Sequence, residues 1–130
     1  MDIIMKQLIQ SLQLLSTDYE EQVRVLPESL CVPDEIALNF DQYYLMKDQL
    51  VEKGLVSLEQ EKHLDEINEL LETMSTADDK TFLWSLEGLQ KDPRWAELRQ
   101  KARSALGAFG RKQEKPNLSG VTYIEGTKQK

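Results

Sequence analysis

The chain has 130 residues, 40% of them hydrophobic and 30% charged, a balance typical of one globular domain with a single core. Its net charge of −7 argues against nucleic acid as a partner, because phosphate binding needs a basic surface. One cysteine and one histidine exclude an intramolecular disulfide and a structural zinc site built from cysteine and histidine ligands.

The N-terminal segment predicts an amphipathic helix over residues 2–15, because its apolar residues recur every three or four positions. Polar residues interrupt it at helical spacing, so neither a signal peptide nor a membrane span is expected. We therefore expect a cytoplasmic protein. Thr17 and Glu20 have the spacing of a capping box and predict a short second helix that ends near Val25.

Pro27 and Pro33 predict an ordered, partly buried connector in which the lone Cys31 is a small core residue. A long helix is expected from Asp34 to Lys53, with the following glycine as its C-terminal stop. This helix carries the candidate functional residues.

Three further elements follow. Ser57 caps a helix over 58–74 whose apolar stripe is Leu64, Ile67, Leu71 and Met74. A polar loop over 75–81 leads to a single turn that Ser85 caps and that ends at Leu89, and Asp92 caps a last helix that ends near Phe109. An aromatic corner of Phe82, Trp84 and Trp95 is expected to pack two helices together.

The last twenty residues, 111–130, carry five basic and two acidic side chains, and we expect a mobile tail. The predicted fold is all-α: a single compact bundle of four to five helices over residues 1–110, followed by this irregular basic tail.

The expected helix 34–53 has two faces. Ile36 and Phe40 belong to the core side, whereas Leu38 and Leu45 point nearly the opposite way. Four acids surround these two leucines: Asp34, Asp41, Asp48 and Glu52. Two interpretations stay open. The leucines pack under another helix of the chain, which is the favoured one, or the six residues form a surface that binds a basic protein.

Catalysis by these carboxylates is not expected, since helical residues seven positions apart rise about 10.5 Å, farther than paired catalytic carboxylates stand. Glu59, His63 and Glu66 could supply metal ligands from one helix face, but no second histidine completes a bundle-type metal site. No cofactor-binding motif is present, and no cofactor is expected.

The segments "VLPESLCVPDEIALNFD" and "FLWSLEGLQKDPRWAELRQKARSAL" resemble a family of small bacterial proteins in which a leucine-proline pair, a V-x-D-E-L/I-A-L-x-F helix start and an L-W-x-x-E-x-L segment recur in this order. The resemblance covers most of residues 8–109 and implies a compact helical domain. It implies no activity.

The sequence therefore predicts a non-catalytic protein-binding module with a basic partner. Immunity proteins and antitoxins, which neutralise basic nucleases, are its most concrete model, by analogy of size and charge. The alternative is a helical homodimer that meets its own copy through Leu38 and Leu45, or through the Leu64–Met74 stripe. A metal-dependent enzyme is the third hypothesis.

Overall fold

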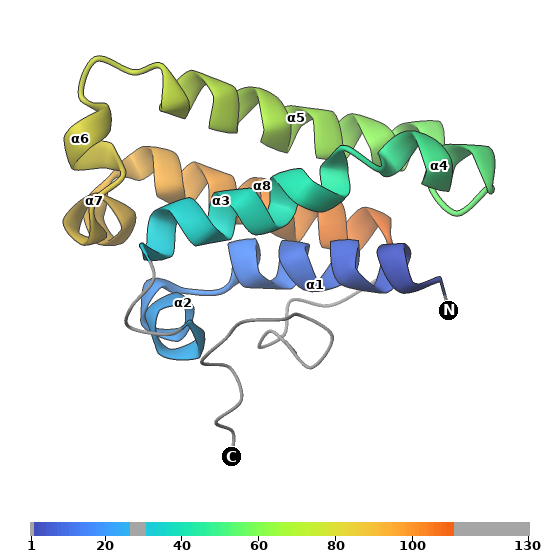
Figure 1. Ribbon diagram of the computed structural model, residues 1–130, viewed down its shortest axis with the longest axis horizontal. Helices are drawn as coiled ribbons and strands as arrows, with labels where there is room; N and C mark the ends of the chain where they lie inside the picture. The colour runs from blue at the N-terminus through green and yellow to red at the C-terminus, as the bar shows by residue number, and fades with distance from the viewer. Residues whose placement is uncertain (1, 27–30, 111–130) are drawn as a thin grey trace.

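The computed structural model describes residues 2–26 and 31–110, and every regular element within these two ranges is an α-helix (Figure 1). The all-α class predicted from the sequence is confirmed, with eight helical segments in these ranges rather than four to five. The expected tail, 111–130, lies outside the described residues. The helices are α1 (Ile3–Ser16), α2 (Tyr19–Val25), α3 (Val32–Tyr44), α4 (Lys47–Glu52), α5 (Leu58–Ser75), α6 (Lys80–Leu83), α7 (Leu86–Lys91) and α8 (Pro93–Ala108).

Four helices form the body of the bundle. α1 packs against α3 and α8, and α5 packs against α8 and α3 (Figure 1). Burying one Leu, Ile or Phe side chain in such a core contributes about 1.5–3 kcal/mol. Side chains with no exposed surface come from every one of these helices and include Leu8, Leu12, Ile36, Phe40, Leu64, Ile67, Met74, Trp95 and Leu98.

The apolar stripe of α5 lies in this core. Leu64, Ile67 and Met74 have no exposed surface, and Leu71 retains only 8%. The stripe is therefore not available as a dimer surface, which corrects one form of the homodimer hypothesis.

No helix among the described residues is long and apolar enough to cross a membrane.

Most of the predicted caps are present. The Ser57 capping box forms with both of its hydrogen bonds, Ser85 Oγ accepts from the backbone N–H of Gly88, and Asp92 Oδ1 accepts from that of Arg94. The start of α2 differs: Asp18 accepts from the N–H of Glu21, so the cap lies one residue beyond the predicted Thr17.

The single helix predicted over 34–53 is wrong, because α3 ends at Tyr44, Met46 leaves helical geometry, and the chain begins again as α4 at Lys47. Two long-range contacts accompany this break. Lys47 Nζ lies 2.5 Å from a carboxylate oxygen of Glu61, and the Tyr44 hydroxyl donates to Asp65 at 2.7 Å. Both partners belong to α5, so the break turns α4 towards that helix.

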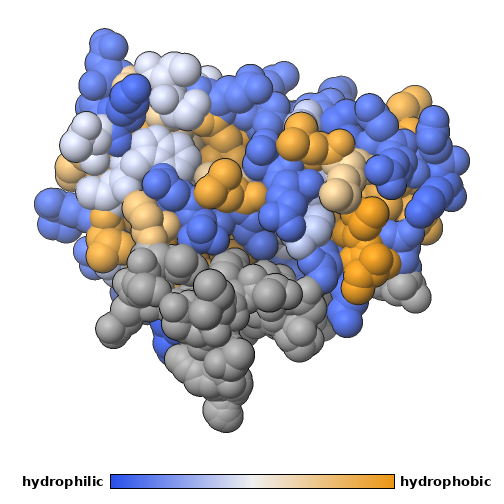
Figure 2. Space-filling model, in the orientation of Figure 1, coloured by the Kyte–Doolittle hydropathy of each residue, from blue (hydrophilic) through white to orange (hydrophobic). Residues whose placement is uncertain are grey.

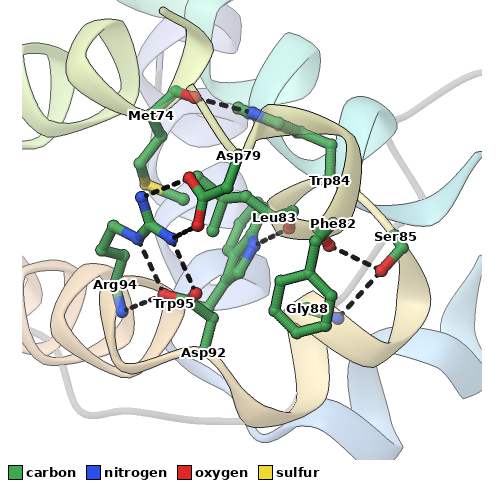
Figure 3. Close-up of polar contacts among 10 residues, drawn as sticks. All are labelled: Met74, Asp79, Phe82, Leu83, Trp84, Ser85, Gly88, Asp92, Arg94 and Trp95. Carbon is green, nitrogen blue, oxygen red and sulfur yellow. Dashed lines mark hydrogen bonds and ion pairs between the residues drawn. The ribbon is translucent and has the colours of Figure 1, made fainter. Parts of the chain in front are cut away.

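A helical corner joins α5 to α8. Here the polar loop predicted over 75–81 is partly wrong, since α6 begins at Lys80. The predicted aromatic corner is confirmed for its two tryptophans, whose rings pack edge to face at 5.2 Å. Trp84 Nε1 donates to the Met74 carbonyl at 3.0 Å and Trp95 Nε1 to the Leu83 carbonyl at 2.8 Å, so each indole ties one element to the next (Figure 3).

Arg94 also stabilises this corner, through hydrogen bonds to two aspartates. The guanidinium of Arg94 donates to Asp79 at 2.6 Å and to Asp92 at 2.8 Å (Figure 3). These hydrogen bonds hold the pKa of both carboxyls below its usual range. The corner fixes the position of Trp84, which is half-buried and forms part of the site described next.

Candidate functional site

A groove of about 540 Å³ lies between α3 and α5 and is open to solvent. On the face of the molecule shown in Figure 2, small hydrophobic patches lie among hydrophilic side chains over these two helices. The groove lining combines both kinds of residue. Its apolar members are Ala37, Leu38, Leu71 and Trp84, and its polar members are Asp34, Asp41, Asn68, Glu72 and Ser75.

The α3 wall follows from the helical repeat. Asp34, Ala37, Leu38 and Asp41 occupy positions i, i+3, i+4 and i+7, so they share one face of the helix. The other face is anchored in the core by Ile36 and Phe40, neither of which has exposed surface. This anchoring determines which side of α3 faces the groove.

The α5 wall has the same spacing. Asn68, Leu71, Glu72 and Ser75 are also i, i+3, i+4 and i+7, which gives the two walls a matching length of two helical turns. Trp84 lines the groove as well, fixed by its hydrogen bond to the Met74 carbonyl at the end of α5.

The carboxylates of the groove have no cationic partner among the residues that the structure describes. Within residues 2–26 and 31–110, no lysine or arginine forms an ion pair with Asp34, Asp41 or Glu72. Glu72 accepts a hydrogen bond of 3.3 Å from the Asn68 side chain. The negative charge of the groove is therefore available to an external cation.

The basic residues of α8 have polar partners within the described part of the chain. Besides Arg94, Lys101 lies within 3.9 Å of Glu66 and Glu97. Arg99 and Arg103 instead donate to neutral acceptors, the Leu89 and Ser16 carbonyls.

The structure separates the six predicted partner-binding residues into two groups. Asp34, Leu38 and Asp41 line the groove. Leu45, Asp48 and Glu52 do not, because the break after α3 takes them away from its face. Asp48 has a cation beside it, Lys47 Nζ at 3.4 Å.

The favoured interpretation that Leu38 and Leu45 pack under another helix is wrong. Their side chains are 58% and 73% exposed. The helix that could have covered them, α5, instead packs beside α3 and leaves the groove between the two. An exposed leucine between unpaired carboxylates is the feature that this arrangement produces.

Sequence reasoning missed the second wall. Asn68 and Glu72 had no predicted role, Ser75 was placed in the predicted polar loop, and Leu71 belonged to the predicted core stripe. A usable signal was present, since the spacing of these four residues repeats that of Asp34, Ala37, Leu38 and Asp41. Tertiary packing decides which two helix faces lie opposite one another. The residue pattern of a single helix does not contain this information.

The groove carries little reactive chemistry. Its one hydroxyl, on Ser75, donates to the Glu72 carbonyl at 2.8 Å. No group of three or more potential metal ligands occurs among the described residues. Of the proposed ligand trio on α5, Glu66 pairs with Lys101 at 3.8 Å.

Cys31 lies at the start of α3 and is exposed, contrary to the expectation of a core residue. Partial desolvation of the sulfur, to which the nearby Asp34 carboxylate adds, raises the pKa of this thiol although the residue is exposed. A raised pKa leaves less thiolate at neutral pH, so Cys31 is a poor nucleophile.

No protein-family model matches the chain, and the comparisons with curated proteins and with solved structures find no significant match. The resemblance to small bacterial helical proteins therefore stays a prediction. Any function has to be argued from the geometry and charge of the groove.

Proposed function

We propose that this protein is a non-catalytic binding module whose α3–α5 groove receives a basic partner protein. One observation carries the proposal: Leu38 is 58% exposed between Asp34 and Asp41, and neither carboxylate has a cationic partner in the described part of the chain. An apolar centre within a charged rim is the ordinary layout of a protein interface.

The two kinds of residue have separate physical roles. Burial of Leu38 and of the exposed part of Trp84 under a partner supplies affinity, at about 25 cal/mol for each Å² of apolar surface removed from water. The carboxylates mainly accelerate association with a positively charged surface and disfavour acidic partners. Because exposed charges are screened by salt, association is expected to slow as ionic strength rises.

Inhibitors of basic nuclease toxins, such as immunity proteins and antitoxins, are the most specific form of this proposal. The net charge of −7 and the chain length of 130 residues suit such a role. A single free cysteine suits a reducing compartment, so we place the protein in the cytoplasm.

The test is a quantitative pull-down from the native host with three forms of the protein. The first is the wild type, and the second carries Asp34→Lys with Asp41→Lys. The third, a charge-matched control, carries Glu20→Lys with Glu59→Lys, two exposed acids outside the groove. All three are compared at low and high salt after circular dichroism has shown that each is folded.

A basic protein retained by the wild type and the control, and lost from the groove variant, is the expected result. Retention should also fall at high salt. If all three forms retain the same proteins, the groove is not the binding surface and the proposal fails.

A further inference from the structure

We propose that the occupant of the groove is a cationic amphipathic α-helix of the partner, which contributes about two turns to the contact. Its apolar face would contact Leu38 and the exposed part of Trp84, and its lysines or arginines would lie beside the carboxylates. This inference rests on the proposed function and deepens it, because it names the secondary structure and residue pattern of the ligand.

The backbone of the groove walls selects a helix over an extended segment. Both walls are helices whose interior backbone groups are already hydrogen-bonded, and the described residues contain no strand edge to which an extended peptide could add. A bound helix satisfies its own backbone hydrogen bonds. It therefore needs nothing from the walls except side-chain contacts.

The dimensions of the groove match this ligand. The lining spans eight residues on α3, from Asp34 to Asp41, and eight on α5, from Asn68 to Ser75. The ends of such a stretch are seven helical steps apart, a rise of about 10.5 Å. A helix bound between these walls presents its apolar residues i, i+3, i+4 and i+7 over the same length.

The charge distribution specifies the flanks of the ligand. Asp34 and Asp41 stand on one wall and Glu72 on the other, so acidic groups border the apolar lining on both sides. A helix with an apolar stripe and cations on each side of it complements this pattern. A second copy of the chain fits poorly, because an isologous contact would bring these unpaired carboxylates towards their own equivalents.

The test uses three capped synthetic peptides of about 14 residues. The first has leucines on one helical face and lysines on both flanks of that face. The second has the same composition with leucine and lysine alternating, which disperses the apolar face of a helix. The third keeps the leucine face and replaces every lysine by glutamate. Binding is measured by calorimetry and by tryptophan fluorescence, since Trp84 lines the groove.

The helical lysine peptide should bind at least about tenfold more tightly than either of the others. Among protein variants, Leu38→Ala should weaken this binding about tenfold, as expected for a central anchor. Leu45→Ala and Leu58→Ala are matched controls, because these leucines are 73% and 77% exposed and lie outside the groove. Their affinity should equal that of the wild type.

Four results would overturn the inference. Equal binding of the helical and alternating lysine peptides would show recognition of charge without recognition of a helix. Equal losses from Leu38→Ala and Leu45→Ala would assign binding to a wider surface than the groove. Wild-type protein that binds none of the peptides, or that sediments as a dimer which Leu38→Ala dissociates, would exclude this occupant.

The proposed function and the helical ligand can fail separately, because they are judged by different experiments. The proposed function is judged by the pull-down, in which a basic partner that depends on Asp34 and Asp41 can be found whether or not that partner presents a helix.

Discussion

A Cβ atom added at Gly88 would lie 2.6 Å from the carbonyl oxygen of Leu83, and closer still to that of Phe82. The start of α7 therefore meets the end of α6 at a distance that only glycine permits. This close approach holds the corner in which Trp84 and Trp95 pack together (Figure 3).

Replacing Gly88 by alanine should destabilise the protein by about 1–3 kcal/mol, because backbone rather than a flexible side chain blocks the new methyl group. Urea unfolding followed by circular dichroism measures the change. Gly107→Ala is the matched control: open space surrounds that position of α8, and a gain of about 0.5–1 kcal/mol is expected there. Similar losses at both positions would contradict this account.

Acid should destabilise the corner. Arg94 lowers the folded-state pKa of Asp79 and Asp92 below the ordinary value of 3.8. Their contribution is therefore complete above that value and is lost as the pH falls below about 4 through the folded-state pKa. Asp92→Asn keeps the helix cap. In this variant the free energy of unfolding should depend less steeply on pH below about pH 4 than it does in the wild type. Asp78→Asn, next to Asp79 but outside the ion-pair network, is the control, and an equal loss of pH dependence there would refute the assignment.

The Tyr44 hydroxyl should lose its proton at a higher pH than an ordinary tyrosine. Burial, reinforced by the hydrogen bond to Asp65, raises its pKa to about 12 from 10. A group that holds its proton more tightly in the folded state stabilises the protein at pH below 10, and this stabilisation is lost between about pH 10 and 12. Comparing the ultraviolet absorbance of tyrosinate in the wild type and in Tyr44→Phe should show that the variant lacks the transition near pH 12. Loss of a transition near pH 10 instead would contradict the assignment.

Gln22 should be a strong determinant of stability although it is polar. Its buried amide donates to the Leu14 carbonyl at 3.0 Å and to that of Leu15 at 3.3 Å, and its oxygen accepts from Arg99 at 3.0 Å. Gln22→Ala leaves these groups without their partner and should cost about 2–3 kcal/mol. Gln49→Ala, at an exposed position of α4, should change the free energy of unfolding by less than about 0.5 kcal/mol.

Cys31 should react in the folded protein, because its side chain is exposed. Its raised pKa predicts a slow reaction at neutral pH, slower than that of the same chain unfolded in denaturant. A chromogenic disulfide reagent measures both the stoichiometry and the rate. Modification that occurs only after unfolding would show that the thiol is buried.

Local signals in the sequence predicted much of the fold. Caps at Ser57, Ser85 and Asp92 mark the starts of α5, α7 and α8, because a cap depends only on residues within one turn. The apolar stripe of α5 likewise identified its core face. These predictions succeeded where neighbours in sequence decide the structure.

The failures concern contacts that the sequence does not reveal. The break between α3 and α4 accompanies contacts of Tyr44 and Lys47 with residues 21 and 14 positions away. Three of the nine residues that line the groove were predicted as partner-binding, Asp34, Leu38 and Asp41, because they share a helix face. The α5 wall was not predicted, because it depends on which faces meet in the bundle.

The break after Tyr44 also limits the length of the groove. Were α3 continuous to Lys53, the aspartates would extend over a third and fourth turn, and longer cationic ligands would gain with each turn. Instead Lys47 lies beside Asp48 and offsets its charge. A ligand helix longer than the groove would meet no further unpaired aspartate of this row, so we expect the proposed site to favour short cationic helices over long ones.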